Sequence, residues 1–417
     1  MYRLIRELYP FCRSITGNGV RETLRAIGSY IPLRVEEMPT GTKVLDWTIP
    51  KEWNIKDAYI KTLTGEKVVD FADSNLHVMG YSLPVSKRIS LDELRKHLYT
   101  VPEHPTWIPF RTSYFKEDWG FCLTHNQLVG LTDSEYEVCI DSSLEPGFLT
   151  FGESYLPGEK SDEVVFSCHI CHPSLCNDNL SGIALLTILA KYLSQVPLSY
   201  SYRFLFIPST IGSIAWLSQN ERQLWKIKHG LVIAGVGDPG KLTYKKTRRG
   251  DAEIDKAVLH LLKNSGQDFR VLDFYPYGYD ERQFCSPGFN LPVGCFSRTP
   301  HGHYPEYHTS ADSLDFVRPQ YLADTLLQSL AVIAVLENNN TYVNQNPKGE
   351  PQLGRRGLYR GYPHNGVDDL ALLWVLNMSD GSHTLLDIAE RAGITFADVR
   401  KAADALVESN LLKQIRE

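Results

Sequence analysis

Two histidines and an aspartate with metal-binding potential lie close together in residues 164–182. The apolar run VVF is followed by His169 and His172, and Asp178 lies six residues after the second histidine. Imidazole nitrogens and a carboxylate are ligands that suit zinc. Ligands of open α/β sheets bind at the carboxyl ends of strands. A strand that ends near His169, followed by a helix from residue 182, therefore predicts half of a metal site.

Further candidate ligands lie downstream, again at or just after predicted strand ends. Asp238 occupies the turn GVGDPG after the third strand, and His308 lies in the segment HGHYPEYHTSADSLDFV. The complete order is therefore histidine, aspartate, aspartate, histidine.

With these residues, the sequence resembles the co-catalytic zinc aminopeptidase clan, which includes leucyl-type aminopeptidases and glutaminyl cyclases. The resemblance rests mainly on NDNLSG and YHTSADS, and covers roughly residues 1–40 and 135–335. It implies that His169 is the first ligand, Asp178 the bridging aspartate, Asp238 the later aspartate and His308 the last ligand. In particular, the chain is similar to a branch with a β-rich insert and a C-terminal winged helix. That branch is often found beside polysaccharide or natural-product biosynthesis.

The sequence departs from the clan pattern at two places. Cys171 replaces the aspartate of a His-x-Asp motif, and Ser209 and Thr210 replace an acidic pair. The first acid of that pair is the family's general base and the second holds one zinc ion, and a neutral hydroxyl can do neither. One zinc ion is therefore expected rather than two.

Two sets of ligands for that ion stay open. One consists of His169, Asp178 and Asp238, and the other of Asp178 and His308 with either His169 or His172.

The catalytic base must then come from elsewhere, since Ser209 occupies its usual position. The nearest acidic candidates are Asp280 and Glu281 in the segment GYDERQF, which resembles a clan segment near the site. Such a base would transfer a proton to the leaving amine, a role worth roughly 10²–10⁴-fold in rate.

Substrate contacts are predicted in two segments. Arg248 and Arg249 of KKTRRG could bind a carboxylate or phosphate, although a solvated charged hairpin is the favoured explanation. Tyr304, in the segment that carries His308, is a further candidate.

A structural zinc site is an alternative for the first segment, because Cys168, Cys171 and Cys176 lie beside the two histidines. No partner CxxC motif occurs elsewhere, and buried cysteines usually behave as small hydrophobic residues.

Short apolar strands alternate with helices in the central part of the chain, which predicts a mixed or parallel sheet with helices on both faces. The strands are expected at 164–168, 202–207, 229–235 and 291–296, and the helices at 182–193, 212–220, 255–265 and 319–336. Residues 1–42 and 132–345 should form this aminopeptidase-like domain. Residues 43–131, which are rich in aromatics and prolines, should form an inserted β-rich domain.

A winged helix is predicted at the C-terminal end of the chain, within a domain of residues 346–417, and residues 337–367 are polar and expected to form a linker or wrapping segment. Its helices are expected at about 368–378, 384–392 and 396–409, followed by a strand at 411–415. Residues 368–417 contain nine acidic and five basic residues. DNA-binding proteins need a basic face, so a protein contact, such as a homo-oligomer interface, is favoured.

The composition excludes several classes of function. The net charge is only −6 over 417 residues, which argues against nucleic-acid and anionic-membrane partners. Neither a run of about 18 apolar residues nor a signal-peptide pattern is present, and eight cysteines are too few for a disulfide framework. We expect a cytoplasmic protein.

We therefore expect a zinc-dependent, aminopeptidase-like hydrolase that acts on a small amide or an N-terminal residue. A single-zinc acyl transferase or cyclase is one alternative. A catalytically silent scaffold is the other, because Ser209 and Thr210 replace the acidic pair.

Overall fold

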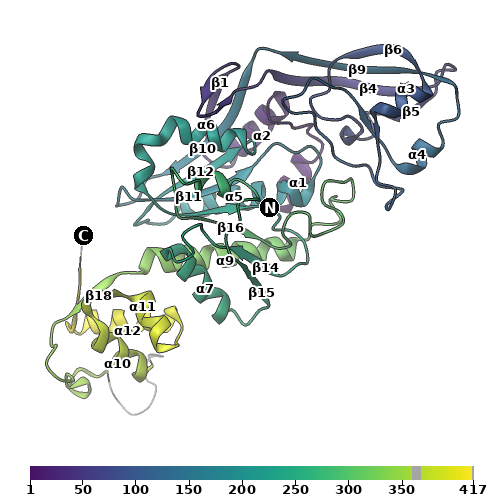
Figure 1. The fold of residues 1–417 in the computed structure, drawn as a ribbon. Coiled ribbons are helices and arrows are strands. Elements are labelled where there is room, and N and C mark those ends of the chain that lie inside the picture. The colour runs from purple at the N-terminus through teal and green to yellow at the C-terminus, as the bar shows by residue number, and fades with distance from the viewer. Residues whose placement is uncertain (359–367, 416–417) are drawn as a thin grey trace. The chain divides into compact units, whose positions relative to one another are not determined.

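A mixed sheet of eight strands forms the centre of the fold (Figure 1). The computed structural model describes residues 1–358 and 368–415. The strand order in this sheet is β1-β10-β12-β11-β13-β16-β14-β15. The strands are β1 (Arg34–Pro39), β10 (Phe148–Leu156), β11 (Glu163–His169), β12 (Ser201–Ile207), β13 (Ile227–Ile233), β14 (Leu242–Lys245), β15 (Phe269–Leu272) and β16 (Val293–Ser297). Strands β11, β12, β13 and β16 are parallel, whereas β1, β10 and β14 form antiparallel pairs, so the predicted mixed sheet is confirmed.

Helices α5 (Ser181–Leu193) and α6 (Ile211–Asn220) cover opposite faces of this sheet. The connection through α5 leads from β11 to its neighbour β12, and the connection through α6 leads back past β11 to β13. Because such parallel crossovers are right-handed, the two helices must lie on opposite faces. The direction of winding changes between β11 and β13, and ligands of open α/β sheets bind at such a point.

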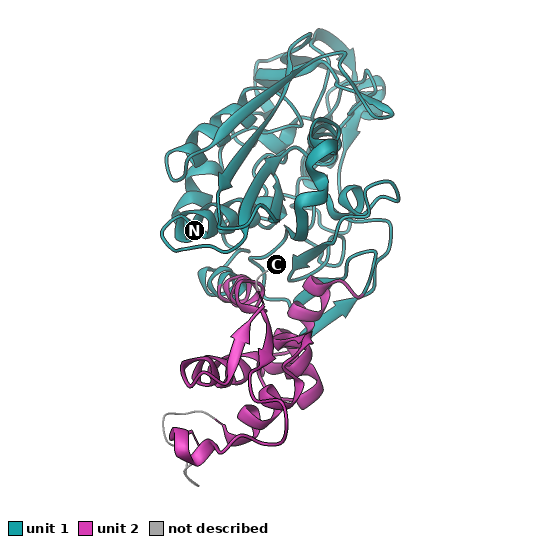
Figure 2. Cartoon of the chain, turned by 90° about the vertical axis from the view of Figure 1, so that its left-hand side faces the viewer, with its two compact units in different colours: residues 1–250, 269–326 teal, residues 251–268, 327–417 magenta. Residues whose placement is uncertain are grey.

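The chain divides into two compact units (Figure 2). Unit 1 contains residues 1–250 and 269–326, and unit 2 contains residues 251–268 and 327–417. The inserted β-rich part belongs to unit 1. Helix α7 (Glu253–Asn264) and the last turns of α9 (Pro319–Asn338) group with the C-terminal residues, which differs from the domain ranges expected from the sequence.

The N-terminal residues form two separate helices. These are α1 (Tyr2–Leu8) and α2 (Asn18–Gly28). Pro10 follows the first helix, and Gly17, with a φ of 96°, precedes the second. Proline and a left-handed glycine both interrupt a helix.

The insert contains a four-stranded antiparallel sheet with the order β5-β4-β9-β6. Its strands are β4 (Glu52–Lys61), β5 (Lys67–Asp70), β6 (Val85–Ser90) and β9 (Glu135–Glu145). The shorter elements are β2 (Lys43–Val44), β3 (Trp47–Thr48), α3 (Leu91–Leu94), β7 (Leu98–Tyr99), β8 (Phe121–Cys122) and α4 (His125–Val129). Strand β9 begins beyond residue 131, the expected end of the insert, and continues through a turn into β10 of the central sheet.

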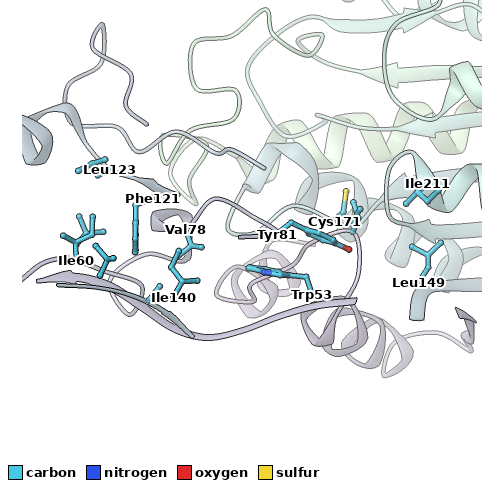
Figure 3. Packing of buried hydrophobic residues seen from close by; sticks show 14 of the residues in the cluster. Trp53, Ile60, Val78, Tyr81, Phe121, Leu123, Ile140, Leu149, Cys171 and Ile211 are labelled. Atoms are coloured by element: carbon cyan, nitrogen blue, oxygen red, sulfur yellow. The ribbon is translucent and has the colours of Figure 1, made fainter. Parts of the chain in front are cut away.

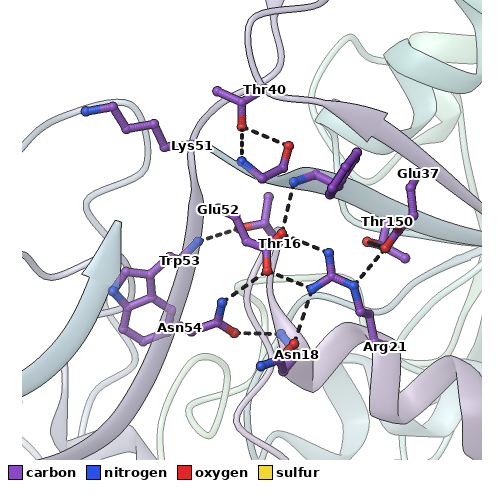
Figure 4. Close-up of polar contacts among 12 residues, drawn as sticks. Thr16, Asn18, Arg21, Glu37, Thr40, Lys51, Glu52, Trp53, Asn54 and Thr150 are labelled. Carbon is purple, nitrogen blue, oxygen red and sulfur yellow. Dashed lines mark hydrogen bonds and ion pairs between the residues drawn. The ribbon is translucent and has the colours of Figure 1, made fainter. Parts of the chain in front are cut away.

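One hydrophobic core joins the insert to the central sheet (Figure 3). Ile60 and Ile140 of the insert belong to the same buried cluster as Leu149, Cys171 and Ile211, which lie at the central sheet. Polar contacts reinforce this junction (Figure 4). Arg21 on α2 makes two hydrogen bonds to Glu52 at the start of β4, of 2.7 and 2.8 Å.

Unit 2 contains the predicted winged helix. Its helices are α10 (Asp369–Met378), α11 (Leu385–Ala392) and α12 (Phe396–Glu408), and its three-stranded sheet has the order β18-β17-β19. The strands are β17 (Thr341–Asn344), β18 (Asp380–Thr384) and β19 (Leu412–Gln414). The expected polar linker, residues 337–367, therefore contributes the central strand of this sheet, and its residues 359–367 lie outside the described part.

Helix α9 is the one helix in the described part with the length and mean hydropathy of a membrane span, and 39% of its most apolar window is buried. Its first turns carry polar contacts within unit 1. Asp324 accepts a hydrogen bond of 2.7 Å from Arg298, and Thr325 donates one of 3.3 Å to the carbonyl of Val236.

A candidate metal centre

The centre of the site is the carboxylate of Asp178. Its Oδ1 lies 2.8 Å from Nε2 of His169, the last residue of β11, and both side chains are almost fully buried. Asp178 itself lies in the turn between β11 and α5. The strand end and the helix start therefore converge as the sequence predicted.

The second carboxylate oxygen faces two further imidazoles. Oδ2 of Asp178 lies 2.9 Å from Nε2 of His308 and 3.8 Å from Nε2 of His172. The contact between Asp178 Oδ2 and His308 Nε2 does not have hydrogen-bond geometry, and neither atom has a hydrogen-bond partner elsewhere although both are buried. Buried polar atoms without a partner are costly and call for an explanation such as a bound ion.

The donor set fits a zinc ion. The candidate ligand atoms of His169, His172 and Asp178 all lie within 4.8 Å of one another, and His308 approaches the same carboxylate. Imidazole nitrogens and a carboxylate oxygen are usual zinc ligands. Within the described residues this group contains no cysteine, so the structure brings histidines rather than thiols to the carboxylate.

The turn that carries Asp178 is held by side chains from distant segments. The carboxylate of Asp312 accepts hydrogen bonds from the backbone N–H groups of Asn177 and Asp178, of 2.6 and 2.9 Å. The side chain of Asn179 donates to the carbonyl of Ile233 on β13. A Cβ atom at Gly182 would lie 2.5 Å from the Asn179 side chain, so only glycine fits at the start of α5.

The insert positions His308. The backbone N–H of Phe110 donates to the His308 carbonyl at 2.7 Å, and Ile108 and Ser310 exchange two further hydrogen bonds. The Phe110 ring contacts the rings of His308 and His172 edge-on, each at a centroid distance of 5.1 Å. His308 has a φ of 55°, a region that non-glycine residues rarely occupy outside constrained sites.

The electrostatics keep the carboxylate charged and an imidazole neutral. Burial would raise the pKa of Asp178, but the neighbouring His172 and His169 hold it well below its usual value. Burial lowers the pKa of His172 to about 3. Neutral imidazole is the form that binds metals, so the cluster is prepared for a cation.

A cavity of about 260 Å³ opens over the cluster. Ser209 and Thr210, which stand where the clan has its acidic pair, line this cavity together with His169, His172 and Asp178. Half of the other lining residues are aromatic, and one is a cation: Ile15, Trp47, Tyr114, Phe115, Cys171, Ile211, Gly278, Tyr279, Arg282 and Tyr307.

Asp238 does not join the cluster. Its Oδ1 accepts hydrogen bonds from Thr299 and Gly240, of 2.6 and 2.7 Å. Its Oδ2 accepts from Asn177 at 2.9 Å and from the Thr299 backbone at 3.2 Å. Both oxygens of this carboxylate therefore accept hydrogen bonds from neighbouring residues, including Asn177 of the turn that carries Asp178. Asp238 was expected to be a metal ligand, and the structure gives it this supporting role instead.

The two acidic residues expected to supply the base differ in their surroundings. Glu281 forms a buried ion pair of 2.8 Å with Lys245 and does not line the cavity. Asp280 accepts a hydrogen bond of 2.8 Å from Ser213, and the hydroxyl of Ser209 lies beside the same carboxyl. Burial raises the pKa of Asp280 to about 6.

The expected substrate contacts lie elsewhere. Arg248 and Arg249 are exposed and bond to the side chain and carbonyl of Asn290, respectively. Tyr304 is buried and stacks on Phe316. None of the three lines the cavity, so the predicted anion-binding role of the KKTRRG segment is not supported.

Sequence reasoning missed two contributors, Arg282 and Phe110, and it counted a third, Asp312, only as a member of the metal-like HGHYPEYHTSADSLDFV segment. Arg282 lies next to the two predicted acids, but no role was predicted for it. Phe110 had no signal at all, since it belongs to the insert, about 200 residues before His308 in the chain.

Comparisons with known proteins identify the family and the fold. Residues 2–339 match a family model described as "Domain of unknown function (DUF4910)", and residues 340–414 match a winged helix-turn-helix model. The chain is 55% identical, over its whole length and 96% of the relative, to a Clostridium acetobutylicum protein described as a "Putative polysaccharide biosynthesis protein with aminopeptidase-like domain".

Solved structures of other proteins share the fold of this chain. A crystal structure of a "putative peptidase" from Clostridium acetobutylicum has a TM-score of 0.96 at 55% identity, covering 99% of this chain and 96% of that one. A zinc aminopeptidase from Bacillus subtilis has a TM-score of 0.58 at 12% identity, covering 80% of this chain and 93% of that one, which shows a shared fold.

Proposed function

The chain belongs to the DUF4910 family, with an aminopeptidase-like fold and a C-terminal winged helix, and we propose that it is a zinc-dependent hydrolase. Its substrate would be a small amide or an N-terminal residue. The observation that carries this proposal is the buried carboxylate of Asp178, which faces three imidazoles at the switch point of the sheet.

We expect Asp178, His172 and His308 to hold one zinc ion. Asp178 Oδ2 lies 2.9 Å from Nε2 of His308 and 3.8 Å from Nε2 of His172, and neither Oδ2 nor the His308 nitrogen forms a hydrogen bond. His169, which bonds to Oδ1, is the remaining candidate ligand. A zinc ion held there would supply Lewis acidity, which polarises a carbonyl and acidifies water.

Asp280 is the best placed base. Ser209 lines the cavity, and its side chain lies near the buried Asp280 carboxyl. A carboxyl group with a pKa of about 6 can accept a proton near neutral pH. A proton from the cavity would therefore pass through the Ser209 hydroxyl to Asp280, which fills the role that an acidic side chain has in the clan.

A role in polysaccharide biosynthesis is part of the proposal. It is supported by the description of the Clostridium acetobutylicum relative, which is 55% identical to this chain.

Metal analysis tests the site. The purified full chain, supplied with zinc, should bind about one zinc ion per chain, because the proposed ligands form a single site. His308→Ala and Asp178→Asn should each lower the content below about 0.2 ion. His303→Ala is the matched control, because His303 is an exposed histidine of the same segment and should leave the content unchanged.

A zinc content near zero in the unmodified chain would overturn the metal site. If zinc binds but a panel of aminoacyl amides and acyl amides is not hydrolysed, the hydrolase proposal is wrong and the silent scaffold is favoured.

A further inference from the structure

The cavity over the candidate zinc ligands contains one cation without an ion-pair partner, the guanidinium of Arg282. Arg282 is half-buried on α8 (Glu281–Phe284) and lines the cavity. Its Nε atom is buried without a hydrogen-bond partner, and in the described part of the chain no carboxylate lies within ion-pair distance of its side chain. Its guanidinium lies 5.6 Å from the centroid of the Tyr277 ring. An arginine in this state is free to bind an anion.

The same cavity offers no free carboxylate to pair with a cationic ligand. Asp178 is the one acidic residue in its lining, and both oxygens of that carboxylate already face imidazoles. Ser209 and Thr210, where acids would attract a protonated amine, are neutral. The lining therefore favours an anionic ligand over an N-terminal ammonium group.

Aromatic rings surround the remaining space. Tyr279 stacks on His169 at 5.3 Å, and Tyr307 stacks on His308 at 3.9 Å, so these two rings flank the cluster. Trp47 and Phe115 contact each other at 5.2 Å and are 43% and 55% exposed. Exposed aromatic rings at a cavity commonly bind an apolar part of a ligand.

We propose that the substrate is an amide that carries an anionic group and an apolar group, with Arg282 binding the anion. The anion is a carboxylate or a phosphate, both of which match the guanidinium fork. The inference rests on the proposed hydrolase function for the amide, whereas the choice of charge rests on Arg282 alone. Arg282 thereby takes the role that the sequence suggested for Arg248 and Arg249.

Calorimetric titration of the zinc-loaded full chain tests this charge preference. The probes are N-acetylphenylalaninate, its phosphonate analogue, the neutral N-acetylphenylalaninamide and the cationic phenylalaninamide. We expect at least one anion to bind about tenfold more tightly than the neutral amide, because a charge-assisted bidentate contact is worth roughly this much. The tighter of the two anions identifies the carboxylate or the phosphate as the natural group.

Arg282→Gln should abolish this preference and leave the affinity for the neutral probe unchanged, which also shows that the variant is folded. Arg249→Gln is the matched control, since Arg249 bonds only to Asn290 in the structure, and it should keep the preference. Equal affinities for anionic and neutral probes, or a preference that survives in Arg282→Gln, would overturn the proposal.

The two proposals can fail separately. Hydrolysis of neutral amides without an anion preference would contradict the role of Arg282 alone. An Arg282-dependent anion preference without any hydrolysis would contradict the hydrolase alone.

Discussion

At the scale of single residues, Asp312 holds the turn that carries Asp178, the central residue of the candidate zinc site, although Asp312 does not line the cavity. Its two oxygens accept the backbone N–H groups of Asn177 and Asp178, and the side chain is fully buried. The carboxylate of Asp178 can therefore take its position only while this contact persists.

Asp312→Ala should destabilise the protein and weaken zinc binding. Two buried N–H groups would lose their partner, at a cost of about 1–3 kcal/mol each, and loss of such outer contacts lowers metal affinity by about 10–100-fold. Urea unfolding and zinc titration against a chelator measure the two effects. Asp315→Ala, at an exposed position of the same loop, should change neither. A folded Asp312→Ala variant with normal zinc affinity would show that the turn at Asn177 and Asp178 keeps its conformation without the Asp312 carboxylate.

The sequence predicted ligand types better than it predicted which atoms meet. His169, Asp178 and His308 were placed by motifs, and the structure brings these three residues together. His172 was one of two open choices, since spacing along a chain does not show where an imidazole points. Asp238 occupied the expected motif position. However, Thr299, from a segment about 60 residues later, donates hydrogen bonds to both of its carboxylate oxygens.

At the scale of elements, the contact between α2 and β4 makes stability depend on pH. The hydrogen bonds from Arg21 lower the pKa of Glu52 to about 2. A carboxyl whose pKa is depressed in the folded state stabilises the protein above its unfolded pKa, and this contribution disappears as the pH falls through the folded value. The stabilisation should therefore be complete above about pH 5 and lost progressively toward pH 2.

Glu52→Gln should reduce this dependence. The free energy of unfolding in urea should fall less between pH 6 and pH 3 in Glu52→Gln than in the unmodified chain. Glu66→Gln is the control, because Glu66 is exposed, and it should keep the full dependence. Parallel profiles for the unmodified chain and Glu52→Gln would contradict the assignment.

Most of the sheet elements could be predicted, because buried parallel strands form continuous apolar runs. The strand assignments failed where pairing depends on distant partners. The predicted linker contains β17, a four-residue strand that pairs with β18 and β19, and so short a strand has no distinct sequence pattern. The isolated β-bridge between Pro109 of the insert and Thr309, the residue after His308, likewise has no pattern in the sequence that predicts it.

At the scale of the whole molecule, unit 2 shows why domain boundaries are hard to read from a sequence. His260 on α7 bonds to Glu390 on α11 at 2.5 Å and accepts the backbone N–H of Phe396 at 2.9 Å. These contacts join a helix from the middle of the chain to the winged helix across 130 residues. Hydrophobic periodicity predicts α7 itself, but the periodicity contains no information about its partner.

The winged helix leads to the last prediction, which concerns nucleic acid. Residues 368–417 contain nine acidic and five basic residues, a net charge of −4. Two of the basic residues on α12 are already paired, Arg400 with Asp404 at 3.7 Å and Lys401 with Asp398 at 4.0 Å. Since non-specific affinity for DNA comes from the release of counterions by free basic side chains, this surface should bind duplex DNA only weakly.

Fluorescence anisotropy with a labelled random duplex tests this expectation on the full chain. We expect no binding tighter than about 10⁻⁴ M at physiological salt, the weak limit of ordinary non-specific binding. Asp404→Lys combined with Glu408→Lys provides a sensitivity control, because both positions are exposed on α12 and the change adds four units of positive charge. That variant should bind more tightly and lose affinity as salt rises. Salt-sensitive binding by the unmodified chain would instead show that its winged helix contacts DNA despite its charge.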